Sequence, residues 1–408
     1  MKHIIIGAGA AGITAAKTIR SQRHEDEIVI ISTDDAVYSR CMLHKYIAGE
    51  RSEESLSFVP DSFFADNNIK WLSGVTVTGV DIQKKLVMFD AGTESYDRLL
   101  IAAGSESVIP PIENLRGAKN VFGLRSLADA KAIAKNAVNA NNIVIIGAGL
   151  VGMDAAYSLV EKGKKPVVID IANHILSVNL DAHAASIYQA EFEKAGCTFR
   201  LGSGVNSVKL DDNGAIKEVV LGSGETIPCD LAIVAASVRP AVEFLKNSGL
   251  DIQRGIVVDQ HLKAYDGVYA AGDITGLSGT WPNAMNQGEV AAMNMCGMPT
   301  IYSDVYALKS TINFFGIKSL AVGVHTPADG DKSYSRESRG RYEKIILQND
   351  VPIGIILQGN ISRSGIWQYM IKNKISVADI QKPIWKVSFA DAYETTENGE
   401  FKWSVVNV

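Results

Sequence analysis

Two copies of one glycine pattern limit what this chain can fold into more than any other feature of its sequence. Residues 7–12 read GAGAAG and residues 147–152 read GAGLVG. Each copy follows a short apolar run, at 3–6 and 143–146, and the first precedes a stretch with helical spacing at 10–22. A glycine-rich turn that joins a buried strand to a helix is the signature of a dinucleotide-binding unit. The repetition predicts two such units.

Each glycine of the first copy has its own expected role. Gly7 permits the tight turn, Gly9 lets a pyrophosphate approach the backbone, and Gly12 lets the helix pack closely on the strand. The free N–H groups at the start of the helix, at Ala10 and Ala11, then face that pyrophosphate. A second apolar strand follows the helix, and this context separates a binding site from a structural glycine turn.

The second copy adds a signal about which dinucleotide binds. It repeats the glycines as Gly147, Gly149 and Gly152, with Val151 in the first helical turn. The next strand ends in Asp170, 23 residues after Gly147. A carboxylate there accepts hydrogen bonds from a ribose 2′-hydroxyl and repels a 2′-phosphate. The second copy is therefore predicted to bind NADH in preference to NADPH.

The first copy has no acidic residue at the matching strand end. That place holds Ser32, with Asp34 and Asp35 just beyond it. We expect Asp34 to contact the ribose of the first dinucleotide. The alternative is that both carboxylates are solvated loop residues.

A third motif completes the pattern. A short strand at 268–271 runs into Gly272 and Asp273, and 282–295 reads as a helix. In this order the motifs resemble those of the two-dinucleotide-binding flavoproteins, in their pyridine-nucleotide-dependent branch, over residues 1 to about 300. The resemblance implies FAD on the first glycine motif and NADH on the second. It also implies that Asp273 holds the flavin ribitol and phosphate.

Shorter matches are similar to NADH:rubredoxin reductases and to the flavin module of the large nitrite reductase subunit. They lie at 38–43, 124–126, 283–288 and 342–359. The likeness implies further FAD contacts, namely Arg40, Ala103, Gly104 and Asn283. Three positions depart from the family pattern: residues 102–104 lack the usual Thr, Ser237 replaces Gly, and Asp154 replaces Glu.

The chain of 408 residues is too long for one ordinary domain. We expect two Rossmann-like, three-layer ββα-type α/β domains that bind FAD and NAD, the second inserted in the first, and a small C-terminal α+β domain. The FAD-binding domain is predicted at 1–108 and 233–305, the NAD-binding domain at 109–232, and the C-terminal domain at 306–408. In the last domain, strands at 343–348 and 351–357 flank a turn, and a helix follows at 364–373.

Three residues are predicted to act in catalysis at the flavin face. Related NADH peroxidases and coenzyme A-disulfide reductases have a redox cysteine where Cys41 stands. Beside Arg40 and at a helix start, the pKa of its thiol is expected to be lowered, although Cys41 as an apolar filler is the favoured alternative. The resemblance implies that Lys45 approaches flavin N5 and pairs with Asp154. The alternative is a surface lysine and an ordinary helix-terminus carboxylate.

Composition excludes several other functions. The four cysteines are far apart, so a disulfide framework, a redox-active Cys pair and a clustered zinc site are not expected. The net charge of −5 gives no case for nucleic acid or an anionic membrane. No run approaches the roughly 18 apolar residues of a membrane span, which predicts a cytoplasmic protein. Basic residues at 332–344 either steer an acidic carrier or, as the favoured alternative, form a solvated loop.

The predicted function is that of an NADH-dependent FAD oxidoreductase. Hydride passes from NADH to flavin N5, and electrons then pass to a small redox protein such as rubredoxin. Two alternatives stay open. One is a thiol-based NADH oxidase, peroxidase or coenzyme A-disulfide reductase that uses Cys41, and the other is a flavin-binding subunit of a larger electron-transfer complex. The oligomeric state, a homodimer or a larger assembly, is equally open.

Overall fold

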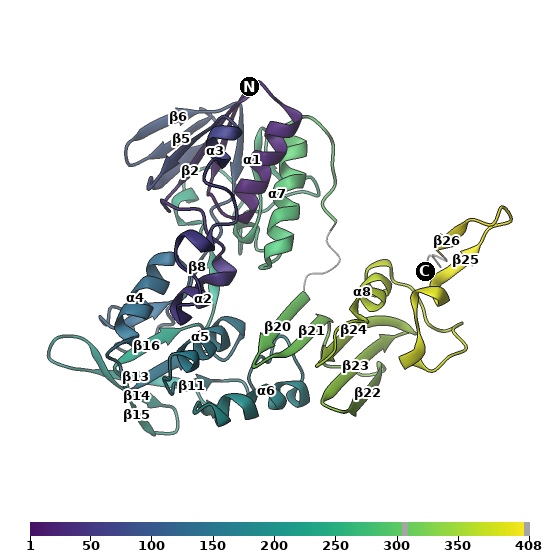
Figure 1. Ribbon diagram of the computed structural model, residues 1–408. Helices are drawn as coiled ribbons and strands as arrows, with labels where there is room; N and C mark the ends of the chain where they lie inside the picture. The colour runs from purple at the N-terminus through teal and green to yellow at the C-terminus, as the bar shows by residue number, and fades with distance from the viewer. Residues whose placement is uncertain (304–308, 404–408) are drawn as a thin grey trace. The chain divides into compact units, whose positions relative to one another are not determined.

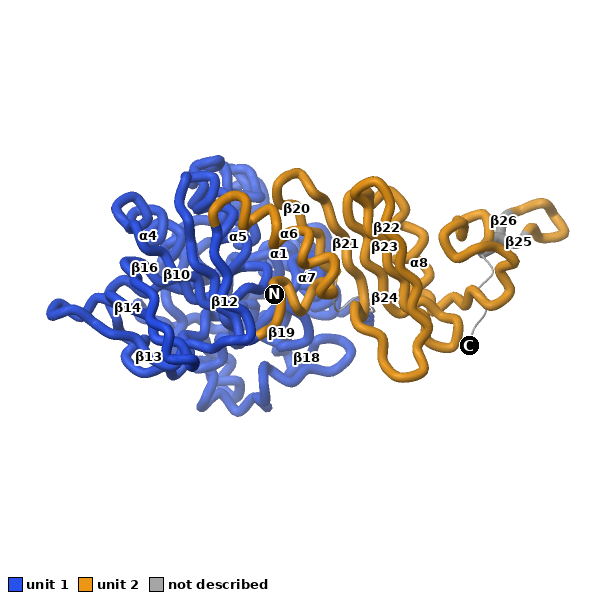
Figure 2. Tube along the Cα trace, turned by 90° about the horizontal axis from the view of Figure 1, so that it is seen from below, with its two compact units in different colours: residues 1–171, 197–304 blue, residues 172–196, 305–408 orange. Residues whose placement is uncertain are grey.

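The computed structural model describes residues 1–303 and 309–403 (Figure 1), and the chain divides into two compact units. The first unit joins Met1–Ile171 to Cys197–Asp304, and the second joins Ala172–Gly196 to Val305–Val408. Figure 2 draws the first in blue and the second in orange. Each unit therefore combines segments that are far apart in the sequence.

The first parallel sheet of the first unit has the strand order β18-β19-β7-β1-β2-β3. All neighbouring strands are parallel except the edge pair β18–β19. The strands are β1 (Lys2–Ile6), β2 (Glu27–Ser32), β3 (Ile69–Ser73), β7 (Arg98–Ile101), β18 (Lys263–Tyr265) and β19 (Val268–Ala270). The sheet thus takes strands from both ends of the unit's sequence.

Both faces of this sheet are covered, which makes three layers. The helices α1 (Ala10–Gln22) and α7 (Trp281–Met295) lie side by side on one face (Figure 1). The antiparallel strands β4 (Val77–Asp81), β5 (Leu86–Phe89) and β6 (Gly92–Ser95) cover the other. Within β1, Ile5 packs toward the helices, whereas Ile4 and Ile6 pack toward the antiparallel sheet. This alternation follows from the two-residue repeat of a strand.

The second parallel sheet repeats the plan with the order β12-β11-β10-β16-β9. Its strands are β9 (Val121–Gly123), β10 (Ile143–Ile146), β11 (Val167–Asp170), β12 (Thr198–Leu201) and β16 (Leu231–Val234). The helices α4 (Leu127–Ala137) and α5 (Leu150–Glu161) contact β16 and β10. The antiparallel strands β13 (Val205–Leu210), β14 (Ile216–Leu221) and β15 (Thr226–Pro228) share an apolar core with this sheet.

A short two-stranded ribbon joins the two parallel sheets. It pairs β8 (Ser105–Ser107) with β17 (Val238–Pro240) in antiparallel register. Glu106 lies opposite Arg239, and their side chains form an ion pair of 2.7 Å. Short helical segments follow the strands at the site, namely η1 (Arg40–Met42), α2 (Leu43–Ala48) and η4 (Asp273–Thr275).

The second unit is built on a five-stranded antiparallel sheet with the order β20-β21-β24-β23-β22. Its strands are β20 (Lys309–Phe314), β21 (Ile317–Gly323), β22 (Lys332–Ser338), β23 (Arg341–Gln348) and β24 (Val351–Gln358). Trp367 and Met370 of α8 (Ser364–Asn373) are buried in its core. The helix α6 (Ala182–Lys194) also belongs here, since the Tyr188 hydroxyl donates to the Ile317 carbonyl at 2.8 Å.

The predicted fold class is confirmed, with two parallel α/β sheets and a C-terminal α+β unit. The helices expected at 10–22 and 364–373 have those bounds in the structure. The predicted domain boundaries stay predictions. They were drawn around the expected FAD and NAD sites, whereas the two units are defined by how compactly the chain packs. In particular, α6 lies within the range predicted for the NAD-binding domain but is part of the second unit.

Candidate functional site

The first glycine turn has free space beside its middle glycine, Gly9. Gly7 has a φ of +106°, and a Cβ there would lie 2.3 Å from the Ala102 carbonyl oxygen. A Cβ on Gly12 would lie 1.9 Å from the Gly7 carbonyl oxygen. A Cβ on Gly9 would meet nothing within 4 Å. The fold therefore requires the outer two glycines, whereas the middle one leaves space for a ligand against the backbone.

The second glycine turn has the same geometry. Gly147 has a φ of +112°, and its Cβ would lie 2.5 Å from the Ala235 carbonyl oxygen. A Cβ on Gly152 would lie 1.9 Å from the Gly147 carbonyl oxygen, and one on Gly149 would meet nothing within 4 Å. The two copies therefore offer the same opening, as a dinucleotide pyrophosphate requires.

Both helices start without a side-chain cap among the described residues. Gly9 is the N-cap of α1 and Gly149 that of α5. The N–H groups of a first helical turn have no partner within the helix. Those of Ala10 and Ala11, and of Val151 in α5, are therefore available for an anion. These positions are the ones that the sequence predicts as pyrophosphate contacts, and that role stays a prediction.

Asp170 is held beside the second turn. Its Oδ2 accepts a hydrogen bond of 2.5 Å from the backbone N–H of Ala148. The carboxylate is thereby fixed at the end of β11, next to the glycine opening. A ribose contact requires this placement, so the geometry supports the predicted role.

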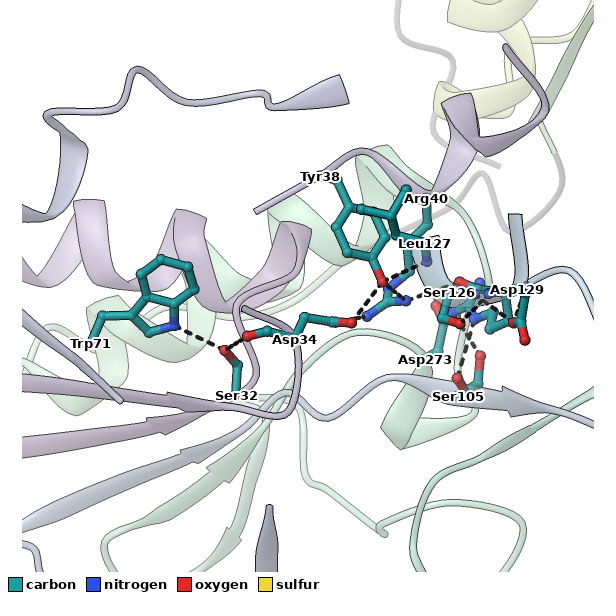
Figure 3. Close-up of polar contacts among 11 residues, drawn as sticks. Ser32, Asp34, Tyr38, Arg40, Trp71, Ser105, Ser126, Leu127, Asp129 and Asp273 are labelled. Carbon is teal, nitrogen blue, oxygen red and sulfur yellow. Dashed lines mark hydrogen bonds and ion pairs between the residues drawn. The ribbon is translucent and has the colours of Figure 1, made fainter. Parts of the chain in front are cut away.

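Asp34 and Arg40 form an ion pair after the second strand (Figure 3). Arg40 Nη2 lies 2.6 Å from Asp34 Oδ2, and the Tyr38 hydroxyl donates to Asp34 Oδ1 at 2.8 Å. Arg40 Nη1 donates to that hydroxyl and to the Arg125 carbonyl, both at 2.9 Å. Asp34 therefore orients Arg40 in this structure, and its contact with a ribose stays a prediction.

Asp273 lies at the other end of this network (Figure 3). Gly272 has a φ of +82°, and its N–H donates to the buried Gln287 side chain at 2.7 Å. Asp273 Oδ2 accepts hydrogen bonds from the Ser105 hydroxyl at 2.9 Å and from Arg125 Nη2 at 2.5 Å. Two donors thus fix a carboxylate at the start of η4, as expected for a residue that receives ribitol hydroxyls.

Arg125 lies in the family-like match at 124–126, but sequence reasoning gave it no role at the site. It lies just before α4, whose capping box joins Ser126 and Asp129. The Asp129 carboxylate accepts from the N–H groups of Arg125 at 3.0 Å and Ser126 at 2.8 Å. The capping pattern is visible in the sequence and predicts a rigid turn. It does not show that the guanidinium reaches Asp273, 148 residues away.

Three further predicted FAD contacts lie on the elements around Asp273. Ala103 and Gly104 directly follow β7, and Gly104 has a φ of +75°. Asn283 is buried in the first turn of α7, and its Nδ2 donates to the Ser278 hydroxyl at 2.6 Å. All three are placed by elements of the first unit, and their contacts with FAD stay predictions.

Cys41 differs from its prediction. Its side chain is exposed in η1. Desolvation raises the pKa of the thiol above its ordinary value, Arg125 nearby lowers it, and Asp154 and Asp273 raise it further. The predicted lowering is therefore wrong in this structure. The main reason is desolvation of the thiol, and Arg40, which was expected to stabilise a thiolate, is paired with Asp34.

Lys45 and Asp154 also have other partners than predicted. Lys45 Nζ lies 2.9 Å from both carboxylate oxygens of Glu50. Asp154 Oδ2 faces His44 Nδ1 at 3.8 Å. Desolvation raises the pKa of the Asp154 carboxyl to about 7, and Lys45 opposes that rise. The predicted ion pair between Lys45 and Asp154 is therefore wrong in this structure. On α2, the His44 side chain faces the Asp154 carboxyl group, and the Lys45 side chain binds Glu50.

Comparison with known proteins identifies the family. Residues 1–288 match the family model described as pyridine nucleotide-disulphide oxidoreductase. The chain belongs to this family. The predicted class, an oxidoreductase that uses a pyridine nucleotide, is therefore confirmed.

Relatives and solved structures agree with this assignment. The chain is 29% identical to the NADH-dependent phenylglyoxylate dehydrogenase subunit epsilon of Aromatoleum evansii, over 93% of each chain. It is 30% identical to a rubredoxin-NAD(+) reductase of Pseudomonas putida, over 74% of this chain and 81% of that one. A solved NADH:rubredoxin oxidoreductase of Clostridium acetobutylicum has the same fold, with a TM-score of 0.76 and 24% identity, over 93% of this chain and 97% of that one.

The residues present fit the two cofactors that the sequence predicts, FAD and NADH. Both glycine turns have the open centre that a pyrophosphate needs, and each helix start leaves N–H groups for it. The Gly-Asp pair lies against the first turn, since a Cβ on Gly272, which precedes Asp273, would be 3.3 Å from the Ala11 Cβ. Only the second has an acidic residue at the end of its next strand, Asp170. The two turns are therefore alike in geometry and different in what surrounds them.

Proposed function

We propose that this protein is an FAD-dependent NADH oxidoreductase that delivers electrons to a small redox protein such as rubredoxin. The observation that carries the proposal is the pair of open-centred glycine turns within one compact unit. One turn holds the flavin, and the other admits a nicotinamide dinucleotide as a substrate. The rubredoxin-NAD(+) reductase among the relatives supports the choice of acceptor.

The chain's own residues bind and orient these molecules. FAD, when bound, would supply a hydride acceptor for NADH and a donor of single electrons. Gly9 and the N–H groups of Ala10 and Ala11 receive the pyrophosphate of FAD, and Asp273 accepts hydrogen bonds from the ribitol. Gly149 and Asp170 receive NADH. No side chain has to act as an acid or base for hydride transfer itself.

A second candidate is favoured by one observation. The dehydrogenase subunit epsilon is matched over 93% of both chains, which makes it a relative of the same length. The protein then serves as the NADH-reactive flavin subunit of a larger complex, and its electron acceptor is a neighbouring subunit. The thiol-based alternative has less support, because the pKa of the Cys41 thiol is raised.

We also place the protein in the cytoplasm, where its cysteines stay reduced.

The proposal is tested by an anaerobic titration of the FAD-loaded protein with NADH. Loss of the flavin absorbance is expected, followed by its return when oxidised rubredoxin is added. Cys41→Ser should react at the same rates and serves as the matched control. A flavin that NADH cannot reduce would refute the proposal. Reduction that rubredoxin does not reverse would favour the subunit of a larger complex, and a Cys41→Ser variant without turnover would favour the thiol enzyme.

A further inference from the structure

A partly buried histidine and aspartate face each other where the two dinucleotide-binding parts of the first unit meet. His44 lies on α2, between the two glycine motifs in sequence, and Asp154 lies in the second turn of α5. His44 Nδ1 is 3.8 Å from Asp154 Oδ2, and the two side chains are only 16% and 23% exposed. At this separation the two atoms face each other but are not hydrogen-bonded.

One hydroxyl ties the two backbones together. The fully buried Ser158 lies one turn after Asp154 on α5. Its Oγ is 2.7 Å from the His44 carbonyl oxygen and 2.8 Å from the Asp154 carbonyl oxygen. The hydroxyl therefore joins α2 to α5 at the place where the facing side chains start. This link holds the two backbones together next to the facing side chains.

Among the described residues, the cations around this pair have other hydrogen-bond or ion-pair partners, including Arg51, which donates to the Ser55 carbonyl at 3.3 Å. Lys45 opposes the rise in the pKa of Asp154, but Glu50 holds its ammonium group. Lys131 of α4, which packs on α2, is paired with Glu53 at 2.6 Å. His44 also interacts with Glu50 and with the Cys41 backbone, and Cys41 is near Arg125, Asp154 and Asp273. Arg40 and Arg125 are paired with Asp34 and Asp273.

Burial drives both members of the pair toward their neutral forms. Desolvation lowers the pKa of His44 to about 4 and raises the pKa of Asp154 to about 7. Between these two values the pair consists of a carboxylic acid and a neutral imidazole, so it is not an ion pair there. A carboxylic acid can donate a hydrogen bond to a neutral imidazole nitrogen once the two atoms approach to hydrogen-bond distance. Near neutral pH the carboxyl group exists as both acid and base, which suits a group that exchanges protons.

We propose that His44 and Asp154, joined through Ser158, hold one proton between Nδ1 and Oδ2 and exchange it with the neighbouring flavin site. The proposal rests on the proposed function. Oxidation of one NADH by two one-electron carriers yields NAD⁺, two reduced carriers and one proton. The Asp154 carboxylate accepts that proton at Oδ2, donates it as a hydrogen bond to Nδ1, and releases it to water before the next turnover. His44 is a positioning residue that acts through Asp154.

The proposal predicts a carboxyl group whose protonation follows the redox state of the flavin. The FAD-loaded protein is reduced and reoxidised at an electrode, without NADH or rubredoxin, while infrared difference spectra are recorded. A carboxylic acid C=O band is expected, with half of its amplitude at a pH of about 7. The band should be absent in Asp154→Asn. In His44→Leu it should move to higher wavenumber, because the acid loses its hydrogen-bond acceptor.

Two further variants test the role of the Ser158 hydroxyl and provide a matched control. Ser158→Ala removes only the tether and is expected to broaden the band or reduce its shift. His183→Gln is the matched control, because His183 faces Glu337 at 3.0 Å in an exposed pair of the second unit. A band that persists unchanged in Asp154→Asn, or a wild-type protein without one, would overturn the proposal. A protein with the band that NADH nevertheless cannot reduce would instead overturn the proposed function.

Discussion

The two middle glycines allow a matched test of whether the first glycine turn binds FAD and the second binds NADH. Gly9 and Gly149 are related by the internal repeat, and a Cβ on either meets nothing within 4 Å. Their φ values are −84° and −72°, in a region that any residue adopts. Gly9→Ala and Gly149→Ala therefore leave the protein folded. Each variant places one methyl group in the opening of one turn and leaves the other turn unchanged.

The expected effects on folding and on binding differ in size. An alanine limits the unfolded chain, which stabilises by about 0.4–1 kcal/mol. An alanine is also a poorer N-cap than glycine, by roughly the same amount, so the two contributions offset each other. In the opening, the methyl group keeps a phosphate away from the backbone N–H groups. Losing one hydrogen bond to a charged group costs about 1.5–3 kcal/mol, which weakens binding by about 10- to 150-fold.

The assay separates the two ligands. FAD affinity is measured from the fluorescence of flavin titrated with the apoprotein, and NADH affinity from the concentration dependence of anaerobic flavin reduction. Gly9→Ala should lose FAD affinity. Gly149→Ala should keep FAD and lose NADH affinity only. Gly12→Ala should fail to fold, because its Cβ would lie 1.9 Å from the Gly7 carbonyl oxygen.

Two results would refute this division of roles. In one, both alanine variants weaken the same ligand, so the two turns are not separate sites. In the other, Gly9→Ala binds FAD as tightly as the wild type, so the open centre of the first turn does not face the pyrophosphate. Circular dichroism of each variant shows whether it is folded and makes the binding results comparable.

Three further predictions concern single side chains. Asp170→Ala with Ile171→Arg should reduce the preference for NADH over NADPH in kcat/KM by about tenfold or more. The carboxylate that repels a 2′-phosphate is removed and a cation that attracts it is added, and a tenfold change corresponds to about 1.4 kcal/mol. Arg125→Ala leaves Asp273 without its guanidinium partner and should weaken FAD binding about tenfold, measured by the same fluorescence titration. Asp154→Asn should raise the melting temperature at pH 8, because the carboxyl pKa of about 7 in the folded protein exceeds about 3.9 in the unfolded chain, a difference of up to about 4 kcal/mol. That gain should vanish below about pH 4, where the carboxyl group is protonated in both states.

Local sequence determines most of what was predicted correctly. The helix at 10–22 and the strand at 143–146 have the expected bounds. Their signals are short-range, because an apolar strand, a glycine with positive φ and a helical spacing follow one another within about 20 residues. The close contact of Gly12 with Gly7 is also within one turn-forming segment. Such features depend little on the rest of the chain, so a single sequence is sufficient to place them.

Pairings between distant side chains were not predictable in the same way. Arg125 reaches Asp273 across 148 residues, and Tyr188 of α6 binds the carbonyl of Ile317 across 129. Neither pair has a local signal, because the residues meet only after the sheets have formed. The Lys45–Asp154 pair came from resemblance, and it was wrong because Glu50, five residues from Lys45, is a closer partner.

Cys41 shows how such pairings decide chemistry. In sequence, its neighbour Arg40 predicts a stabilised thiolate. In the structure Arg40 is bound by Asp34, and the carboxylates of Asp154 and Asp273 are the charges that oppose thiolate formation. A thiol that stays protonated near neutral pH is a poor nucleophile and a poor electron relay. The electrons of NADH then have to leave directly from the flavin, which favours a one-electron carrier over a disulfide or peroxide as the acceptor.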